Sequence, residues 1–304
     1  MRTERRGRHV SSSKRIDCTR LAMSVDDVLS QQPVGYGADS SGELLVRKSA
    51  GVAALILNRP RRHNALDRET LGALRLAIAE LRSDVQTQVV VLTGAGASFC
   101  AGVDISAEGR GDFYAPPQQN ERLYQEAGQE VVWGLLSLPQ VTVAAVNGPA
   151  IGWGTGLATC CDFRCVADSA FFRIPEIGFG MYYDVGCLYS LLSIVGPAQA
   201  KRITMLGEDI AAWEALRIGL ADRVCAAATC SEEVSDWARK LAQRSNPAIR
   251  VTKRHLYAAT VGRYRKLGAV EIELAACYYG SNKDRYEGLA ARELRRTPVF
   301  SREG

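Results

Sequence analysis

Two carboxylates, Glu176 and Asp184, stand eight residues apart in the apolar run IPEIGFGMYYDVG, residues 174–186. In an exposed loop, either side chain would be an ordinary solvated charge. In an apolar pocket the pKa of a carboxyl group rises, and the group can then accept and return protons near neutral pH. The pair therefore indicates general acid–base chemistry, if the fold brings a reacting carbon to it.

Two glycine-containing turns, SFCAGVD (98–104) and NGPAIGWG (147–154), each follow an apolar run. In a βα unit, ligands bind where the carboxyl end of a strand meets the positive N-terminus of the next helix. Two main-chain N–H groups that converge there would form an oxyanion hole, although either turn alone could equally be structural. Neither turn contains GxGxxG or a P-loop lysine, so a phosphate cradle has no support.

Apolar runs and helical periodicity alternate from about residue 43 and predict the elements that position these groups. A hairpin at 43–60 breaks at Gly51, and a helix at 67–84 begins with Asp67 as its N-cap. The other expected strands are 88–94, 141–148, 163–167 and 170–175, and the other expected helices are 118–139, 154–162 and much of the chain from 196. Continuous apolar strands between helices indicate an α/β fold with a largely parallel sheet.

Composition indicates one large globular domain, because 47% of the 304 residues are hydrophobic and 23% are charged. No apolar run is long enough to span a membrane. Residues 1–22 hold seven basic and two acidic residues, which accounts for the net charge of +5 and leaves 31 of each sign elsewhere. We therefore expect no nucleic-acid partner. Residues 1–40 are expected to be a disordered basic arm.

The nine cysteines are scattered, and no two of them form a CxxC pair. The three histidines are not placed to complete a zinc set, so we expect no metal. Most of the cysteines lie in apolar runs and are expected to be small core residues. An odd number of free thiols fits a reducing, cytoplasmic setting, and the basic N-terminus is at most a weak organelle-targeting signal.

Five motifs, in this order, resemble the crotonase family, the enoyl-CoA hydratase/isomerase superfamily. They are LNRPRRHNAL (57–66), SFCAGVDIS (98–106), VTVAAVNGPAIGWGTGLATCCDFRCVA (141–167), PEIGFG (175–180) and EGLAARELRRTPVF (287–300). The resemblance implies a spiral of ββα units over residues 41–235 and a helical C-terminal trimerisation region over 236–304. It also implies a homotrimer or a dimer of trimers, and an acyl-CoA thioester substrate with no separate cofactor.

The resemblance also implies which residues hold the substrate. The main-chain N–H groups of Val103 and Trp153 would bind the thioester oxygen. Many hydratases have glycine at the second place, so the Trp153 indole would either shape the pocket or block it. Arg61 and Arg62 would meet the CoA phosphates, unless they are solvated turn charges. The substrate-binding set comprises Arg61, His63, Ala65, Leu66, Ala101, Gly102, Asp104 and Gly152.

The acidic residues distinguish the reactions of this family. Hydratases hold water between two acids, and this chain has Gly156 at the first position and Glu176 at the second. A single carboxylate favours double-bond isomerisation through a dienolate. AFFRIPEIGFGMYYDVG (170–186) resembles the Δ3,5-Δ2,4-dienoyl-CoA isomerases, in which a proton leaves C2 and another is added at C6. Glu176 and Asp184 would serve these two ends, although that subfamily usually has a third acid at position 156.

Several alternatives stay open at this point. Glu176 could be an acid at a helix N-terminus, Asp184 could be the N-cap of the next helix, and Tyr182 and Tyr183 could line the pocket or only pack. The polar loop 107–120 is expected to set chain specificity. The rival functions are an enoyl-CoA hydratase or other crotonase-type enzyme, and a non-catalytic acyl-CoA binding protein. A Ser-His-Asp hydrolase is not expected, because no GxSxG elbow is present and no histidine lies near a candidate serine in the sequence.

Overall fold

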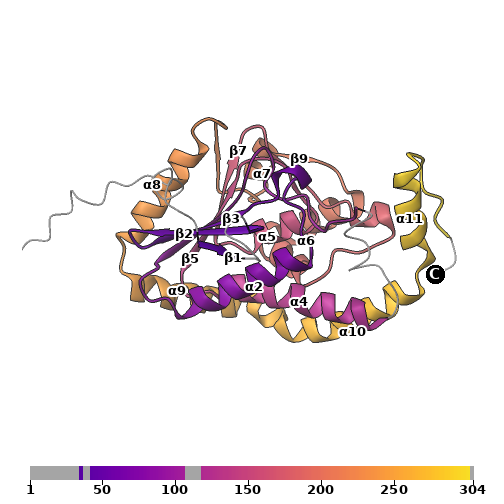
Figure 1. The fold of residues 1–304 in the computed structure, drawn as a ribbon, viewed down its shortest axis with the longest axis horizontal. Helices are drawn as coiled ribbons and strands as arrows, with labels where there is room; N and C mark the ends of the chain where they lie inside the picture. Colours follow the sequence, from indigo (N-terminus) through magenta and orange to yellow (C-terminus); the bar gives the residue numbers. More distant parts are fainter. Residues whose placement is uncertain (1–33, 37–41, 107–117, 302–304) are drawn as a thin grey trace, which may run out of the picture.

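The computed structural model describes residues 34–36, 42–106 and 118–301, and its main element is a seven-stranded sheet (Figure 1). The strand order is β1-β2-β3-β4-β5-β7-β10. From β3 onward neighbouring strands are parallel, while β1 and β2 form an antiparallel edge. The strands are β1 Val34–Tyr36, β2 Leu44–Ser49, β3 Val52–Leu57, β4 Val89–Gly94, β5 Val141–Val146, β7 Phe163–Ala167 and β10 Arg223–Cys225. The predicted α/β fold with a largely parallel sheet is confirmed.

A smaller sheet runs beside the main one and consists of β6 (Ala150–Ile151), β8 (Phe171–Arg173) and β9 (Ile210–Ala211). Two isolated parallel bridges extend it, from Leu66 to Val103 and from Cys100 to Ala150. The segments that follow β3, β4 and β5 therefore lie side by side. This second layer aligns the two glycine turns that the sequence singled out.

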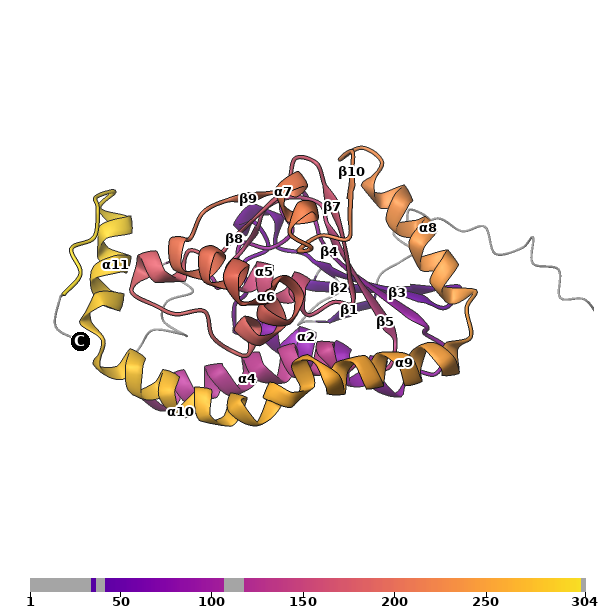
Figure 2. The ribbon, with the colours of Figure 1, turned by 180° about the vertical axis from the view of Figure 1, so that it is seen from behind.

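The helices also follow the sequence prediction, and Asp67 is the N-cap of α2, where its side chain accepts a hydrogen bond from the Thr70 amide. The α-helices are α2 Arg68–Ser83, α4 Gln118–Leu136, α5 Trp153–Thr159, α6 Cys187–Leu206, α7 Ala212–Arg217, α8 Cys230–Ala242, α9 Asn246–Ala259, α10 Arg265–Ser281 and α11 Lys283–Glu293. Short 3₁₀ helices are η2 Pro60–Arg62, η3 Glu176–Phe179 and η4 Val261–Tyr264. α2, α4, α9 and α10 form a layer along one side of the molecule, and α8 and α11 lie at opposite ends (Figures 1 and 2).

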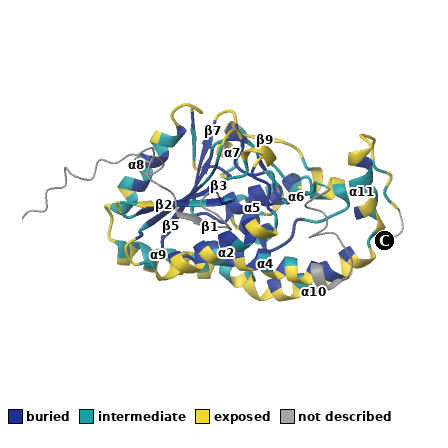
Figure 3. Ribbon diagram, viewed as in Figure 1, coloured by how far each residue is buried: buried dark blue, intermediate teal, exposed yellow. Residues whose placement is uncertain are grey.

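The core lies between the main sheet and its helices (Figure 3). Every residue of β3 and β5 is buried, as expected for parallel strands covered on both faces. Burial of each Val, Leu or Ile side chain stabilises the fold by roughly 1.5–3 kcal/mol. A rigid sheet of this kind fixes the turns at its carboxyl edge.

The C-terminal helices hold the segment that carries Glu176. α10 packs along α4, and α11 packs against η3. A Cβ atom at Gly288 in α11 would lie 2.6 Å from the Phe179 main chain, so the two backbones touch. Tyr278 and Asn282 donate hydrogen bonds to the carbonyl oxygen of Gly180, the residue that ends η3. The position of η3 is therefore fixed by residues that lie about a hundred positions further along the chain.

Two predictions about the less regular segments have different outcomes. Residues 34–36, which were expected to belong to a disordered arm, form β1 and pair with β2. The remainder of that arm and residues 107–117 of the predicted specificity loop lie outside the described residues, and 118–120 begin α4. Among the described helices, none has the length and apolar character required to cross a bilayer.

Candidate active site

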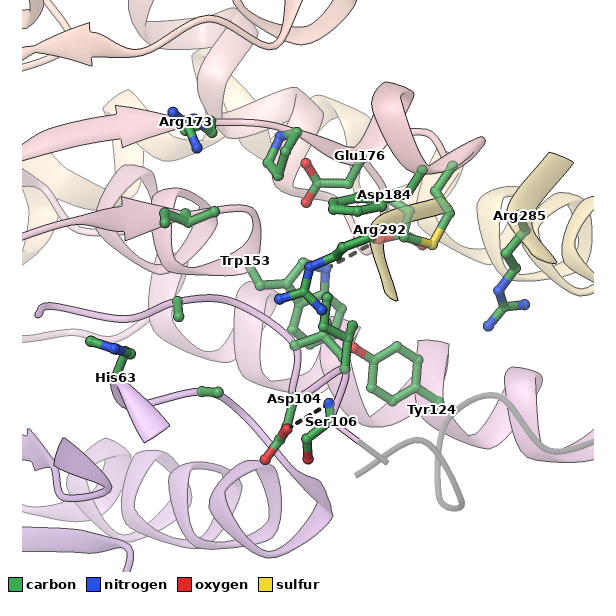
Figure 4. Close-up of a pocket in the computed structure, with 18 of the residues that line it drawn as sticks. His63, Asp104, Ser106, Tyr124, Trp153, Arg173, Glu176, Asp184, Arg285 and Arg292 are labelled. Atoms are coloured by element: carbon green, nitrogen blue, oxygen red, sulfur yellow. Dashed lines mark hydrogen bonds between the residues drawn. The ribbon is translucent and has the colours of Figure 1, made fainter. Parts of the chain in front are cut away.

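A cavity of about 590 Å³ lies between the two glycine turns, η3, α4 and α11 (Figure 4). Its wall brings together nine of the twelve predicted site residues: Arg61, His63, Ala65, Ala101, Val103, Asp104, Trp153, Glu176 and Asp184. Leu66, Gly102 and Gly152 do not line it, and they lie behind the wall as main-chain supports. Their roles in substrate binding stay predictions.

Val103 and Trp153 both line the cavity, and the amides of both are available to an added acceptor. Leu66 bridges the first turn, because its amide donates to the Gly102 carbonyl at 2.7 Å and its carbonyl accepts from the Asp104 amide at 2.9 Å. In such a parallel bridge the N–H of Val103 points away from Leu66. Trp153 is the first residue of α5, where an N–H group has no partner within the helix. Neither amide donates a hydrogen bond to another described residue.

The two turns touch each other at their glycines. A Cβ atom at Gly102 would lie 3.3 Å from the Trp153 nitrogen and 2.7 Å from the Ile151 carbonyl oxygen. Gly152 has φ +53°, and a Cβ atom there would lie 2.6 Å from Oε1 of Glu176. The absence of side chains at these positions therefore allows the two amides and the carboxylate to gather around one space.

Glu176 places its carboxylate against Gly152, the residue before Trp153. Its Oε2 is buried and has no hydrogen-bond partner among the described residues. Burial raises the pKa of Glu176 to about 8; a main-chain hydrogen bond opposes this shift, and the charge of Asp184 adds to it. The side chain lines the cavity, which distinguishes it from an acid that only complements a helix N-terminus. A carboxylate of this kind can take a proton from a carbon atom and return it.

Asp184 accepts hydrogen bonds from three elements that are far apart in the sequence. Gln125 of α4 and Tyr279 of α10 donate to Oδ2 at 2.6 and 3.0 Å, and the Trp153 indole N–H donates to Oδ1 at 3.2 Å. Burial raises the pKa of Asp184, and these three bonds act against that rise. The interpretation of Asp184 as a helix N-cap is wrong, because α6 has Gly186 as its N-cap with no side-chain hydrogen bond.

The Trp153 indole forms one wall of the cavity. It stacks on Tyr124 of α4, with ring centroids 5.1 Å apart and an interplanar angle of 11°. Its outer edge lies over Gly128, where a Cβ atom would come within 1.9 Å of Cη2. Gly128 therefore gives the indole room to turn toward α4 and Asp184.

Gly156, at the position of the first acid in the hydratases, has no room for a side chain. A Cβ atom there would lie 2.3 Å from the Cys187 sulfur and 3.1 Å from the Tyr183 hydroxyl oxygen. Cys187 and Tyr183 are both buried, so neither side chain can move into solvent. The site is thus built around Glu176 and Asp184 without a third acid at this place.

The other end of the cavity holds the residues predicted to bind CoA (Figure 4). His63 has φ +52°, its carbonyl accepts from the Ala101 amide at 2.9 Å, and its Nδ1 lies 2.9 Å from the Ser98 hydroxyl. The carboxylate of Asp104 forms an ion pair with Arg59 at 3.0 Å. Asp104 therefore fastens the turn, while His63 and the exposed Arg61 face the opening of the cavity.

Comparisons with known proteins identify the family to which the chain belongs. Residues 47–303 match the family model described as enoyl-CoA hydratase/isomerase. A crotonyl-CoA hydratase of Syntrophomonas wolfei is 32% identical over 253 residues, covering 82% of this chain and 94% of the relative.

The chain belongs to the enoyl-CoA hydratase/isomerase family.

Solved structures of the family support the fold but carry different names. An enoyl-CoA hydratase from Mycobacterium avium subsp. paratuberculosis has a TM-score of 0.76 and 28% identity, covering 86% of this chain and 99% of its own. A monofunctional enoyl-CoA isomerase from M. smegmatis has a TM-score of 0.61 and 33% identity, covering 71% and 93%. The predicted crotonase-like fold is confirmed, and membership of the family leaves both hydration and isomerisation open.

The sequence prediction missed the residues of α4 and α10 that complete the site. Glu121, Gln125 and Gln129 are buried and recur every four positions, so they form a polar stripe on the inner face of α4. Glu121 pairs with the buried Arg285 at 3.0 Å, and Gln125 holds Asp184. Polar residues at helical spacing within an otherwise apolar face were the signal that could have identified them.

Proposed function

We propose that this member of the family is an acyl-CoA double-bond isomerase, acting on an enoyl-CoA or dienoyl-CoA thioester. The observation that carries the proposal is the pairing of the buried Oε2 of Glu176, which has no hydrogen-bond partner among the described residues, with the two available amides of Val103 and Trp153. The closed space at Gly156 supports it, because no second acid can stand beside a water molecule from that position. CoA enters as part of the substrate, and the proposed reaction requires no separate cofactor.

The proposed reaction begins when the thioester oxygen accepts hydrogen bonds from the amides of Val103 and Trp153. Glu176 then removes a proton from C2, and the electron pair of the C–H bond delocalises into a dienolate whose negative charge rests on that oxygen. With a 3-enoyl-CoA, the proton returns to C4 and the double bond moves to C2–C3. The pKa of about 8 suits a group that must first accept the proton and then give it back.

Asp184 is the proposed second acid for a dienoyl substrate, in which the proton is added at the more distant C6. Its carboxylate lines the same cavity and is held by three donors, which fix its orientation. With a simple enoyl substrate, Asp184 would instead act as the residue that positions the Trp153 indole. If Asp184 is the second acid, Asp184→Asn should lower the turnover of the dienoyl substrate more than that of the enoyl substrate. If Asp184 only positions the indole, the two turnover rates should fall equally.

Hydration is the second candidate because the Syntrophomonas wolfei relative and the Mycobacterium avium structure are both named as hydratases. In that case Glu176 and Asp184 would have to share a water molecule. Separate assays with 3-enoyl-, 3,5-dienoyl- and 2-enoyl-CoA distinguish the candidates. We expect double-bond movement to exceed hydration, and faster hydration of the 2-enoyl-CoA would overturn the proposal.

The matched test compares two buried acids whose pKa values are both raised to about 8. Glu176→Gln should lower kcat by about 10²–10⁴-fold, the range for loss of a general base. Glu271 accepts from the Gly186 amide at 2.7 Å and does not line the cavity, so Glu271→Gln serves as the control. Unchanged turnover in Glu176→Gln would exclude Glu176 as the base. Binding of the three acyl-CoA thioesters by wild type without turnover of any of them would favour the non-catalytic acyl-CoA binding protein.

We also propose that the chain assembles as a trimer or a dimer of trimers. Exposed apolar side chains on the outer surface of α9 and α10 support this, with Leu256, Val270 and Leu274 exposed by 61, 54 and 61%. Such side chains on adjacent helices are typical of a surface that another subunit covers. Sedimentation equilibrium tests the proposal, and a monomer at micromolar concentration would contradict it.

A further inference from the structure

Three cysteine side chains come together where β7, β10 and α8 meet, and none of them lines the active-site cavity. β10 is the edge strand of the main sheet, and α8 lies on the same side of the molecule (Figure 2). Cys165 is in β7, Cys225 ends β10, and Cys230 is the first residue of α8. β7 and β10 are parallel, with Arg223 opposite Cys165 and Cys225 opposite Ala167. Cys165 and Cys225 therefore project from the same face of the sheet, and α8 brings Cys230 to them.

The spacing of the three sulfur atoms suits a shared cation. The Sγ atoms of Cys165 and Cys225 are 3.5 Å apart, and all three lie within 4.8 Å of one another. All three cysteines are free. A cation with bonds of about 2.3 Å to thiolates holds its sulfur atoms roughly 3.8–4.0 Å apart in tetrahedral or trigonal geometry. The observed separations bracket this range, so small side-chain rotations bring the three atoms onto one ion.

We propose that Cys165, Cys225 and Cys230 form a binding site for a thiophilic divalent d¹⁰ cation of the zinc and cadmium class. Three sulfur donors without a nitrogen or oxygen ligand select soft cations over magnesium or calcium. Residues 226–229, between the second and third ligands, are all exposed, which gives the ion a short path from solvent and allows water as a fourth ligand. No metal-binding spacing marks this set in the sequence, because the three ligands come from separate elements.

The charges around the cluster are compatible with such an ion. Three thiolates and one divalent cation leave a net charge of −1, which would be costly without a nearby positive group. The Arg223 guanidinium lies on the same face of β10 and offsets this charge in part, because it also pairs with Glu233 of α8 at 3.2 Å and stacks on the Trp237 ring. The bound ion would join β7, β10 and α8, and so stabilise the folded chain in proportion to ion concentration.

The test uses the reduced, full-length chain with Cys18→Ser and Cys277→Ser, which removes the thiol of the N-terminal segment and the exposed thiol of α10. Titration with Cd²⁺ should produce an ultraviolet thiolate-to-cadmium band that saturates at one equivalent. Adding Cys230→Ser should abolish the band. Adding Cys187→Ser should preserve it, since Cys187 is likewise a buried first residue of a helix, in this case α6.

Three results would overturn the proposal. They are the absence of a saturable band in the starting variant, survival of the band in the Cys230→Ser variant, and its loss in the Cys187→Ser variant. Circular dichroism checks that each variant is folded. If Cys230→Ser does not fold, X-ray absorption of the cadmium-loaded starting variant decides the question, because the proposal requires three sulfur neighbours and fewer would refute it.

Discussion

Replacing Glu176 with Gln should change how the stability of the protein depends on pH. The folded chain holds this carboxyl group with a pKa of about 8, whereas its ordinary pKa is 4.5. Between these values the unfolded chain loses the proton while the folded chain keeps it. The stability associated with the protonated group is therefore full below about pH 4.5 and is lost as the pH rises to about 8.

The size of the effect follows from the two pKa values. Integration of the proton-binding difference from pH 5 to pH 9 gives a loss of about 4 kcal/mol in the free energy of unfolding for wild type. Glu176→Gln has no proton to lose, so its free energy of unfolding should fall by about 4 kcal/mol less over the same interval. Other titrating groups are common to both proteins and cancel in the comparison.

Urea unfolding at pH 5 and pH 9, at equal protein concentration, measures this difference. Glu69→Gln removes an exposed acid from the first turn of α2 and controls for the change in net charge. Equal losses of stability in wild type and Glu176→Gln between the two pH values would refute the raised pKa of Glu176 in the folded chain. An activity loss without this stability signature would mean that the carboxylate at 176 is hydrated in solution.

Three further predictions concern the walls of the site. Gly156→Ala should lower the free energy of unfolding by about 1–3 kcal/mol, because the added methyl group overpacks against the Cys187 sulfur. The double variant with Cys187→Ala should recover most of the lost stability, as measured by thermal unfolding. Gly128→Ala should displace the Trp153 indole and lower kcat/KM together with tryptophan fluorescence anisotropy; unchanged values of both would contradict the packing described. Asp184→Asn removes a charge that raises the pKa of Glu176. If Glu176 is the proposed base, the rising limb of the kcat/KM–pH profile should move to lower pH, and a limb that stays in place would exclude this coupling.

The elements of the fold were predictable because their signals are local. The hairpin turn has Ala50 at φ +48° and Gly51 at φ +82°, as the break at Gly51 indicated. Asp67 caps its helix through a bond that spans three residues. The central strands read as continuous apolar runs because helices cover both faces of the sheet.

The candidate site was predictable only as far as single motifs reach. Glu176, Val103 and Trp153 were predicted because each lies in a short motif of the family, and all three line one cavity in the structure. The environment of Asp184 was not predictable, because its three donors lie 59, 31 and 95 positions away along the chain. An acid three residues before the first residue of a helix is easily interpreted as its N-cap until the distant donors are known.

The brace between α11 and η3 has a consequence for the order in which the protein becomes active. The two glycine turns need the chain only as far as β8, where the Arg173 carbonyl accepts from the Gly152 amide, whereas η3 is fixed by Asn282, which is 102 positions beyond its partner Gly180. Contacts of such long range form late in folding. We expect a folding intermediate that binds an acyl-CoA thioester but does not yet isomerise it. In refolding experiments, the amides of the two turns should then be protected from pulsed hydrogen exchange by the ligand before turnover recovers.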